Sequence, residues 1–533
     1  MRARSFWAWG YEDRFPDDAA RSALGEQVGA LLGVGALSPS APPTLDAITM
    51  PAPSVTAPAS LLAIASTDRR ERALHTHGRA YRDVVRGFRG DFSAAPDLVL
   101  FPRDEADVVA SLAWASEARV MIVPFGGGTS VVGGVEAERR EGYAGIASLD
   151  LRDMDRVREV EPISRTARIE AGVLGPSLEA QLGEHGFTLR HFPQSFEHST
   201  LGGWIATRAG GHFATLATHI DDLVAGVRMV TPTGVLMTPR LPASGAGPSA
   251  DRLVLGSEGI LGVITEAWVR VRPRPRYRAS ATVLFPDLMA ASEAVRAIVQ
   301  AGLFPSNCRV LDPHEAKLAF VPADGGAALL LAFESDDHPL GPWMDRGVAL
   351  AAAHGGHLPR APRHREAGER GGDDAAEAWR KAFFEGPYLQ SSLVTLGVVA
   401  DTFETACPWD RFPALHASVI RAVHDAIERV SGAPGLVSCR FTHAYLDGVA
   451  PYYTFVAPPP KVDVLEAWTV IKTAASDALL AGGGTITHHH AVGRTHRPWY
   501  DRESSAVFGS ALRAAKRALD PAAILNPGVL IEP

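Results

Sequence analysis

Cysteine is scarce in this 533-residue sequence, which holds only Cys308, Cys407 and Cys439. Three dispersed cysteines are too few for a disulfide framework or a cysteine-rich metal site. Their scarcity favours a reducing compartment. Long apolar runs are also missing, because no stretch approaches the roughly 20 apolar residues that span a bilayer. The sequence therefore predicts a protein without a transmembrane segment.

Charge of one sign is not concentrated in any region. The chain has 52 Lys and Arg against 60 Asp and Glu, and its net charge is −8. Scattered basic residues exclude the basic patch that a nucleic-acid partner requires. The Arg-rich run at residues 69–89 has helical spacing and is predicted to be a solvated helix face. The predicted partners are thus small molecules and not nucleic acid.

Targeting signals are also missing from the sequence. Charged residues at 11–14 stand where a signal peptide would need its apolar core. The last three residues are no peroxisomal address. Cytoplasmic residence is the expectation that follows.

Hydrophobic periodicity predicts a mixture of helices and strands in a chain long enough for two or more domains. After residue 275 the pattern changes to longer helices and separate strands. A mobile loop is expected at residues 362–372. The predicted helices are residues 104–117, 178–185, 290–301, 412–430 and 462–481. The predicted strands are residues 119–124, 227–230, 235–237, 268–272, 279–285, 328–333 and 437–456.

A glycine-rich stretch, Pro-Phe-Gly-Gly-Gly-Thr-Ser at residues 124–130, has the chemistry of a phosphate cradle. It follows an apolar strand. The N–H groups of its three glycines can converge on a pyrophosphate, and Thr129 and Ser130 add hydroxyl donors. A plain turn is the alternative. The G-x-G-x-x-G pattern of nicotinamide dinucleotide domains does not occur here.

Two further stretches carry candidate chemistry. Residues 256–265 place three glycines in a β-rich run, where a missing side chain often permits close approach by a ligand; a β-bulge is the alternative. Residues 488–490 are three histidines. They could bind a metal ion or serve structure. Neighbours on an extended strand point to opposite faces, and few carboxylates lie nearby in the sequence, so no metal site is predicted.

The combination of the three stretches at residues 124–130, 256–265 and 488–490, in this order along the chain, resembles the flavoproteins of the vanillyl-alcohol oxidase and para-cresol methylhydroxylase type. Among these flavoproteins the alkyldihydroxyacetonephosphate synthase family is most similar, over nearly the whole chain. The matching stretches also include residues 7–11, 96–100, 196–204, 207–209, 231–234, 403–406, 408–411 and 526–527.

The resemblance implies an α+β fold. It has a two-subdomain FAD-binding domain of the vanillyl-alcohol oxidase type and an α+β cap domain with an antiparallel sheet. The implied divisions are an N-terminal helical region (1–90), the FAD-binding domain (91–275), the cap or substrate domain (276–484) and a C-terminal segment (485–533). That last segment carries the His triplet back to the flavin domain.

The resemblance also implies FAD as cofactor. Some relatives bind flavin covalently through a His or Cys of the glycine loop, and this loop has neither, so the FAD is expected to be non-covalent. The implied cofactor-binding residues are Pro124, Phe125, Gly126, Gly127, Gly128, Thr129, Ser130, Gln194, Ser195, Ser199, Thr200, Thr207, Arg208, Ala209, Gly210, Glu258, Gly259, Ile260, Leu261, Gly262, Val263 and Ile264.

The activity that the resemblance implies is exchange of the acyl group of acyl-dihydroxyacetone phosphate for a fatty alcohol, through an adduct at flavin N5. Tyr452 matches the family's catalytic tyrosine, and His488, His489 and His490 would lie by the flavin ring. Neighbouring imidazoles could activate a tyrosine whose ordinary pKa is near ~10. The alternative for Tyr452 is an ordinary strand aromatic. Peripheral contact with lipid substrates and a homodimer are further expectations.

One position departs from the family pattern. The synthases carry an arginine where this sequence has Gln390, and an amide cannot provide the bidentate charge that reads a phosphate. Arg440, Arg411, Arg380 or Lys381 are candidates to compensate. Otherwise the chain is an FAD-linked oxidoreductase that oxidises an alcohol or 2-hydroxy acid by hydride transfer to flavin N5. Gln390 and Arg440 are the predicted substrate-binding residues.

Overall fold

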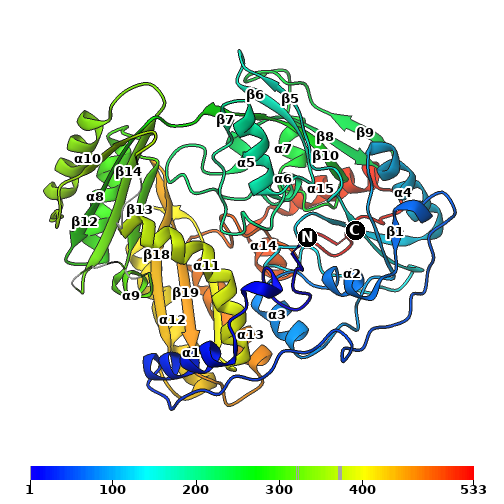
Figure 1. The fold of residues 1–533 in the computed structure, drawn as a ribbon, viewed down its shortest axis with the longest axis horizontal. Helices are drawn as coiled ribbons and strands as arrows, with labels where there is room; N and C mark the ends of the chain where they lie inside the picture. The colour runs from blue at the N-terminus through cyan, green and yellow to red at the C-terminus, as the bar shows by residue number, and fades with distance from the viewer. Residues whose placement is uncertain (1, 320, 322, 324, 370–374, 533) are drawn as a thin grey trace.

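The computed structural model describes residues 2–319, 321, 323, 325–369 and 375–532, without the side chains of residues 375–378, 380 and 381. Two β-rich units lie side by side, with helices on their outer faces (Figure 1). The α+β architecture predicted from the sequence is confirmed. Among the described residues, no helix has both the length and the apolar character to cross a membrane.

The first unit contains a small, mainly parallel sheet in the order β1-β2-β4-β3. All but one residue of β3 are buried, which explains its continuous apolar run. Asp104 caps α4 by accepting the N–H of Asp107, and α4 then leads into β3. The elements are α2 (Arg69–Leu74), α3 (Tyr81–Phe88), α4 (Glu105–Ala118), β1 (Ala65–Ser66), β2 (Leu98–Leu100), β3 (Val120–Phe125) and β4 (Gly145–Asp150).

A five-stranded antiparallel sheet completes this unit, in the order β5-β6-β10-β8-β9. The predicted hairpin forms where Thr231 pairs with Gly234. The strands are β5 (Val157–Glu161), β6 (Thr166–Glu170), β8 (Val224–Thr231), β9 (Gly234–Met237) and β10 (Val263–Arg270). The helices are α5 (Gly175–Glu184), α6 (Leu201–Thr207) and α7 (Ala250–Val254), and β7 (Phe187–Thr188) pairs with β11 (Arg272–Pro273).

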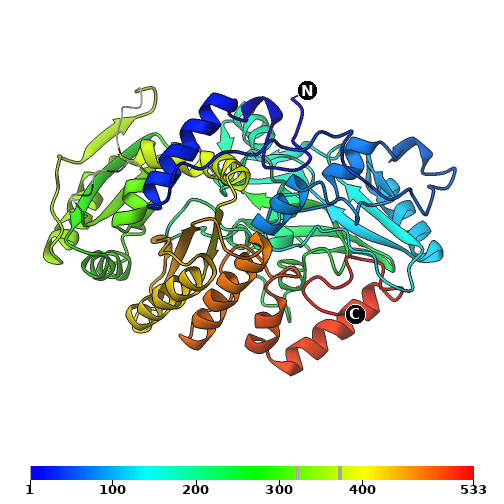
Figure 2. The same ribbon diagram turned by 90° about the horizontal axis from the view of Figure 1, so that it is seen from below.

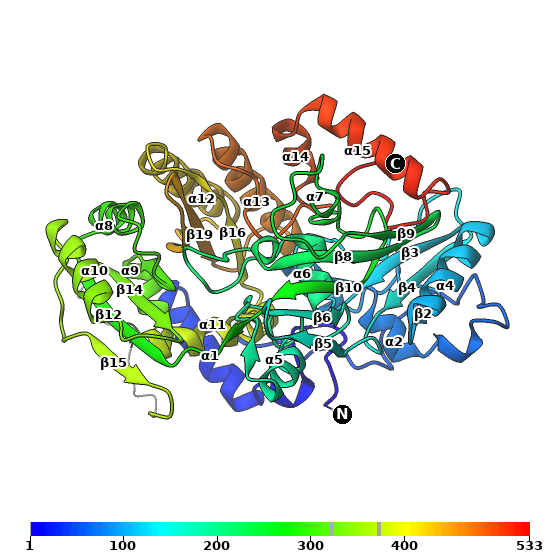
Figure 3. The ribbon, with the colours of Figure 1, turned by 90° about the horizontal axis from the view of Figure 1, so that it is seen from above.

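The second unit is one antiparallel sheet in the order β15-β12-β14-β13-β18-β19-β16, with β17 paired to β19. Helices lie along this sheet (Figure 3). The predicted strand region 437–456 is a hairpin of two strands. The strands are β12 (Tyr277–Phe285), β13 (Asn307–Leu311), β14 (Ala327–Ser335), β15 (Arg363–Glu366), β16 (Val399–Glu404), β17 (Cys407–Pro408), β18 (Leu436–Ala444) and β19 (Gly448–Ala457). The helices are α8 (Leu288–Gln300), α9 (Pro313–Leu318), α10 (Gly341–Ala353), α11 (Ala375–Thr395), α12 (Phe412–Ser431) and α13 (Val464–Ala481).

Two sequence-based expectations need correction. The loop predicted at 362–372 contains β15, which pairs with β12 at the sheet edge, while its last residues lie outside the described part of the chain. The arginines of 69–89 do not all face solvent. Arg72 and Arg79 are buried, because their guanidinium groups bond backbone carbonyls. A charge pattern alone does not reveal such internal acceptors.

Both ends of the chain pack on these units. Helix α1 (Asp18–Leu31) lies against the second unit, where Val28 shares a core with Leu393 and Val456. At the other end, α14 (Arg497–Glu503) and α15 (Ala506–Leu519) lie along the lower side of the molecule (Figure 2). Ile122 of β3 donates its N–H to the carbonyl of Ile524 over 2.8 Å and forms a parallel bridge with Leu525. The C-terminal segment therefore extends the small sheet of the first unit.

Candidate functional site

The glycine loop begins at the end of β3 and packs tightly against residues 198–200. A Cβ on Gly127 would lie 1.8 Å from the carbonyl oxygen of His198, a distance that no side chain tolerates. Gly128 has a φ of +67°, in the left-handed region that favours glycine. Close backbone approach and a left-handed turn both require glycine here, which is the physical reason for the repeated glycines.

A pocket runs from this loop towards β10. It is bounded by the loop, by the segment that leads into and along α6, and by the residues before β10. The predicted cofactor residues that line it are Pro124, Phe125, Gly126, Ser130, Thr200, Thr207, Glu258, Gly259, Gly262, Val263 and Ile264. Apolar walls with backbone and hydroxyl donors at one end fit a dinucleotide with an aromatic ring and a pyrophosphate.

The other predicted cofactor residues surround this pocket in different ways. Gln194 donates to the carbonyl of Phe383 over 3.0 Å, and Arg208 bonds Asp221 at 2.8 Å. The remaining positions are Gly127, Gly128 and Thr129 in the loop, Ser195 and Ser199 before α6, Ala209 and Gly210 after it, and the buried pair Ile260 and Leu261. The pocket lining thus contains part of the predicted set.

Glu258 links the pocket to the segment that follows the His triplet. Its buried carboxylate accepts the N–H groups of Val492, over 2.9 Å, and Gly493, over 2.8 Å. Burial raises the pKa of Glu258 to about 7, although both N–H groups oppose the rise. The side-chain amide of Asn526 donates to the Glu258 carbonyl over 2.8 Å. Glu258 is therefore a connection between distant chain segments as well as a wall of the pocket.

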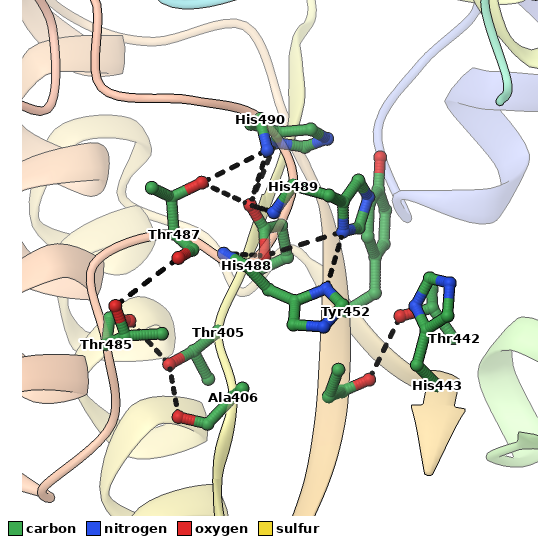
Figure 4. Close-up of polar contacts among 12 residues, drawn as sticks. Thr405, Ala406, Thr442, His443, Tyr452, Thr485, Thr487, His488, His489 and His490 are labelled. Atoms are coloured by element: carbon green, nitrogen blue, oxygen red, sulfur yellow. Dashed lines mark hydrogen bonds and ion pairs between the residues drawn. The ribbon is translucent and has the colours of Figure 1, made fainter. Parts of the chain in front are cut away.

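The three histidines wrap around a single carboxylate. The backbone N–H groups of His488, His489 and His490 donate to Glu404 over 2.6, 3.2 and 3.0 Å. Thr487 donates its hydroxyl to the same group over 2.6 Å (Figure 4). These residues form bends and no strand. The argument that alternating strand faces keep the imidazoles apart is therefore wrong.

The carboxylate and the imidazoles of this cluster differ in their protonation. Glu404 lies at the end of β16 and is buried, but the neighbouring imidazoles hold its pKa well below its usual range. Burial lowers the pKa of His488 and His490 well below the ordinary value and also lowers the pKa of His489. At neutral pH the cluster therefore consists of one carboxylate and three neutral imidazoles.

Further side chains that the sequence did not single out complete the cluster. Tyr445 bonds Nε2 of His488 through its hydroxyl at 2.7 Å, and His219 bonds the His488 carbonyl at 2.8 Å. The Nε2 of His443 contacts the Gly211 carbonyl at 3.1 Å. His219 and His443 belong to no recognisable motif, so only the fold reveals them. Tyr445 and Glu404 stand in stretches that carry the family resemblance, and that signal could have identified them.

The cluster brings imidazole nitrogens close to one another. Nδ1 of His488 lies 3.0 Å from Nδ1 of His489, and one ring nitrogen from each of these residues and from His443 lies within 4.8 Å of the others. Imidazole nitrogens at such spacing are compatible with a shared ion. The prediction that the triplet holds no metal stays a prediction, although its stated reasons do not hold.

Tyr452 lies in β19, opposite Glu404 of β16 and Arg440 of β18. Its hydroxyl donates to Thr402 over 2.9 Å, and its ring contacts those of His489 and His490 with centroids 5.9 and 5.5 Å away (Figure 4). Burial raises the pKa of Tyr452, so the resting phenol is neutral. Among the described residues, no imidazole hydrogen-bonds the Tyr452 hydroxyl, whereas Tyr445 has a direct bond to His488 of the triplet.

The two predicted substrate residues are both engaged inside the protein. Gln390 accepts the indole N–H of Trp9 over 3.2 Å and donates to Asp401 over 3.3 Å. Arg440 forms a buried ion pair with Glu315, and its guanidinium lies 3.9 Å from the centre of the Tyr452 ring. The side chains of Arg380 and Lys381, named as possible replacements for a missing arginine, lie outside the described residues.

The sequence gives no prediction for a second cation near the cluster, Arg309. Arg309 is buried, and its guanidinium lies 3.8 Å from the centre of the Trp379 ring. Burial lowers its pKa to about 9, and its charge contributes to the low pKa of His443. Among the described residues, no carboxylate comes within ion-pairing distance of Arg309. Its position in an ordinary strand sequence gave no signal of this environment.

Comparisons with known proteins agree with this geometry. The family model described as FAD binding domain matches residues 96–238, and the one described as FAD linked oxidases, C-terminal domain, matches residues 274–530. The chain is 32% identical over 482 residues to alkyldihydroxyacetonephosphate synthase of Trypanosoma brucei brucei, covering 87% of this chain and 78% of that one. The corresponding Dictyostelium discoideum protein is 31% identical over 478 residues, with the same coverage of both chains.

More distant relatives include glycolate oxidase subunit GlcD of Bacillus subtilis (strain 168), 26% identical over 449 residues that cover 82% of this chain and 89% of that one. A solved structure of an alkyldihydroxyacetonephosphate synthase has the same fold, with a TM-score of 0.81 at 24% identity over 98% of both chains. The chain belongs to the alkyldihydroxyacetonephosphate synthase family of FAD-linked oxidases and is an FAD-dependent enzyme.

Proposed function

We propose that this chain exchanges the acyl group of acyl-dihydroxyacetone phosphate for a fatty alcohol. The observation that carries the proposal is the position of Tyr452, a neutral phenol held by Thr402 and packed against His489 and His490. Similarity to two synthases over 87% of the chain supports the same activity. One ester C–O bond breaks and one ether C–O bond forms, so a fatty acid leaves and no net oxidation occurs.

The pocket between the glycine loop and β10 is the proposed FAD site. Its lining fits the cofactor, since glycines approach the neighbouring backbone closely and hydroxyl groups stand at one end. The loop contains no His or Cys, which supports a non-covalent complex. When bound, FAD supplies an electron-accepting ring system. Acid precipitation tests the linkage: the flavin should appear in the supernatant, and flavin in the pellet would contradict the proposal.

The protein's own groups would handle the proton. Tyr452 Oη is the proposed proton carrier, and the Thr402 hydroxyl orients it. Burial raises the pKa of Tyr452, whereas the guanidinium of Arg440 over its ring favours the ionised form. Glu404 would act as a positioning residue, because it fixes the backbone of all three histidines.

A product assay tests this activity directly. FAD-saturated enzyme should convert acyl-labelled acyl-dihydroxyacetone phosphate and a long-chain alcohol into an ether and an equimolar amount of labelled fatty acid. Alcohols of several chain lengths should be supplied, since the structure does not define the preferred one. Labelled fatty acid without any ether, or no turnover with all alcohols, would overturn the proposal.

Gln390 favours a second candidate, an FAD-linked oxidoreductase acting on an alcohol or 2-hydroxy acid. Its amide is neutral and already bonded to Trp9 and Asp401, so it presents no charge to a phosphate. Anaerobic mixing separates the two candidates. Bleaching of the flavin by an alcohol or 2-hydroxy acid, persisting until an electron acceptor is added, would support the oxidoreductase and contradict the synthase.

Gln390→Arg sharpens this choice. If position 390 lines a phosphate site, the new guanidinium should lower the Michaelis constant for a phosphorylated ketone, since a hydrogen bond to a charged group is worth about 1.5–3 kcal/mol, roughly one to two decades. If the substrate is an uncharged alcohol, the same change buries an unpaired cation and weakens binding. An unchanged Michaelis constant for both substrate classes would remove residue 390 from the site.

Several broader assignments belong to the same proposal. We propose that FAD binds to residues 91–275 together with the returning segment 485–533. The substrate would bind mainly to the cap, residues 276–484. Residues 1–90 form the N-terminal region. All three cysteines are free and buried, which supports a reducing, cytoplasmic setting. A homodimer and peripheral contact with lipid substrates remain predictions, which light scattering and vesicle co-sedimentation would test.

A further inference from the structure

Two arginines flank the glycine loop from outside the pocket. The guanidinium of Arg4 donates to the carbonyl of Gly127 over 2.5 Å. The backbone N–H of Arg79 donates to the carbonyl of Ser130 over 2.6 Å, and its guanidinium reaches back to the Ser5 carbonyl, next to Arg4, over 3.1 Å. The two side chains therefore converge on one side of the loop.

Neither guanidinium has an acidic partner. Among the described residues, no carboxylate lies within 4.0 Å of Arg4 or Arg79, and the guanidinium of Arg79 donates only to backbone carbonyls. Arg79 is 4% exposed. Burial lowers the pKa of both residues, and the charge of Arg4 lowers that of Arg79 further, to about 9. A buried and a half-buried guanidinium close together without a counter-ion are an unfavourable arrangement that a bound anion would relieve.

The nearest acids are already occupied. Asp83, whose charge acts on Arg79, lies 3.5 Å from Arg82 and accepts the N–H of Ala80. Asp150 and Glu71, whose charges act on Arg4, both contact Arg152, at 2.7 and 3.1 Å, and Asp150 also contacts His75 at 2.9 Å. These carboxylates therefore do not neutralise the arginine pair.

An imidazole nitrogen near the two arginines also lacks a hydrogen-bond partner. His198 is buried, its Nε2 contacts the Tyr388 hydroxyl at 3.2 Å, and its Nδ1 has no hydrogen bond. Burial, followed by the charges of Arg4 and Arg79, lowers the pKa of His198 to about 3. A neutral imidazole in this field can donate one N–H to an anion through Nδ1.

The pair also lies next to the position where the expected phosphate-reading arginine is replaced. The indole N–H of Trp9 is shared between the carbonyl of Arg79, at 3.1 Å, and the side chain of Gln390, at 3.2 Å. Residue 390 is therefore linked to the backbone of Arg79 through a single shared donor. Planar guanidinium forks suit a phosphoryl group.

We propose that Arg4 and Arg79, with His198, form an anion site beside the glycine loop that binds a phosphoryl group. The expected source is the phosphate of the substrate, and this assignment rests on the proposed function. The pyrophosphate of the cofactor has the same chemistry, and the experiment separates the two sources.

The test uses Arg79→Gln and Arg4→Gln in the holoenzyme. Arg103→Gln is the control, because Arg103 is exposed and pairs only with Asp107. If the substrate is the source, each site variant should raise the Michaelis constant of the phosphorylated ketone about 10–100-fold. It should also weaken inhibition by inorganic phosphate and leave FAD content and the Michaelis constant of the unphosphorylated ketone unchanged. If the cofactor's pyrophosphate is the source, the dissociation constant of FAD should instead rise by a similar factor.

Unchanged FAD affinity and unchanged phosphate affinity in both variants would overturn the site. If a Gln variant fails to fold, Arg79→Lys replaces it, because Lys keeps the charge but lacks the planar fork. The affinity for phosphate or for FAD should then fall by a smaller factor. Wild-type affinities for both FAD and phosphate in Arg79→Lys would also overturn the proposed site. If the enzyme forms no ether at all, the proposed function fails, but binding of inorganic phosphate and FAD by wild type and variants still decides this inference.

Discussion

The glycine-lined pocket and the histidine cluster use opposite means to build a site. In the pocket, side chains are missing where the backbone must approach closely, as at Gly127. In the cluster, residues 487–490 wrap around the Glu404 carboxylate, and side chains from other segments contact His488. The glycine loop of the pocket can thus be recognised in local sequence, whereas the cluster depends on how the two units and the C-terminal segment come together.

The two regions differ in electrostatics as well. The pocket presents backbone and hydroxyl donors, and two unpaired arginines stand behind its loop. The cluster holds one buried carboxylate and neutral imidazoles. A phosphate-bearing ligand suits the first region, and proton transfer suits the second. Under the proposed function, cofactor binding falls to the first unit, and proton transfer falls to the junction of both units with the C-terminal segment.

The largest effect is expected at the pocket. Gly127→Ala would place a Cβ 1.8 Å from the carbonyl oxygen of His198, so the backbone must move. Overpacking typically costs about 1–3 kcal/mol, and more where the backbone shifts. The purified variant should lack flavin absorbance. Gly245→Ala is the control, since nothing lies within 4 Å of its added Cβ. Normal FAD content in Gly127→Ala would break the link between this loop and the cofactor.

The next effect concerns the chemistry of the cluster. Tyr452→Phe removes one hydroxyl and should keep FAD bound while lowering turnover about 10²–10⁴-fold, the usual contribution of a general acid or base. Tyr445→Phe is the companion variant, because Tyr445 makes the direct bond to His488. A larger loss in Tyr445→Phe than in Tyr452→Phe would transfer the proposed proton role to Tyr445.

The contrast between the pocket and the cluster also explains which features could be predicted from the sequence. The glycine loop, the helix after Asp104 and the hairpin at residues 231–234 follow from local rules, and all form where the sequence predicts them. His219 and His443 join the cluster only through long-range packing. Long-range contacts of this kind leave no local pattern.

Two errors have physical causes. The sequence predicts an extended strand for the histidines, but the carboxylate of Glu404 draws three successive N–H groups to one point and bends the chain. The spacing of the arginines in residues 69–89 predicts a solvated helix face, but backbone carbonyls of distant segments bind Arg72 and Arg79. In both cases an internal acceptor overrides the local preference.

Glu404→Gln tests whether the cluster depends on one charge. The amide keeps the shape but presents an NH₂ group to backbone N–H donors, and each buried donor left without an acceptor costs about 1–3 kcal/mol. We expect a lower denaturation midpoint together with reduced turnover. Glu428→Gln, at an exposed position of α12, is the control. Wild-type stability in Glu404→Gln would show that the imidazoles do not need the carboxylate.

The smallest effect is expected at Glu258, which joins the pocket to the segment after the triplet. Burial raises its folded pKa to about 7 from an ordinary value of 4.5. A group whose pKa is raised on folding stabilises the protein fully below the unfolded pKa, and this contribution is lost as pH rises through the folded pKa. Glu258 therefore contributes less stability at pH ~8 than at pH ~4.5.

Glu258→Gln removes this titration and keeps a carbonyl to accept one of the two N–H groups. The stability of wild type relative to the variant should therefore fall by about 1–3 kcal/mol between pH ~5 and pH ~8. Denaturation of both proteins at several pH values measures the difference, in which the contributions of other titrating groups cancel. A constant difference across this range would mean that Glu258 is ionised throughout, and that the bonds to Val492 and Gly493 outweigh its burial.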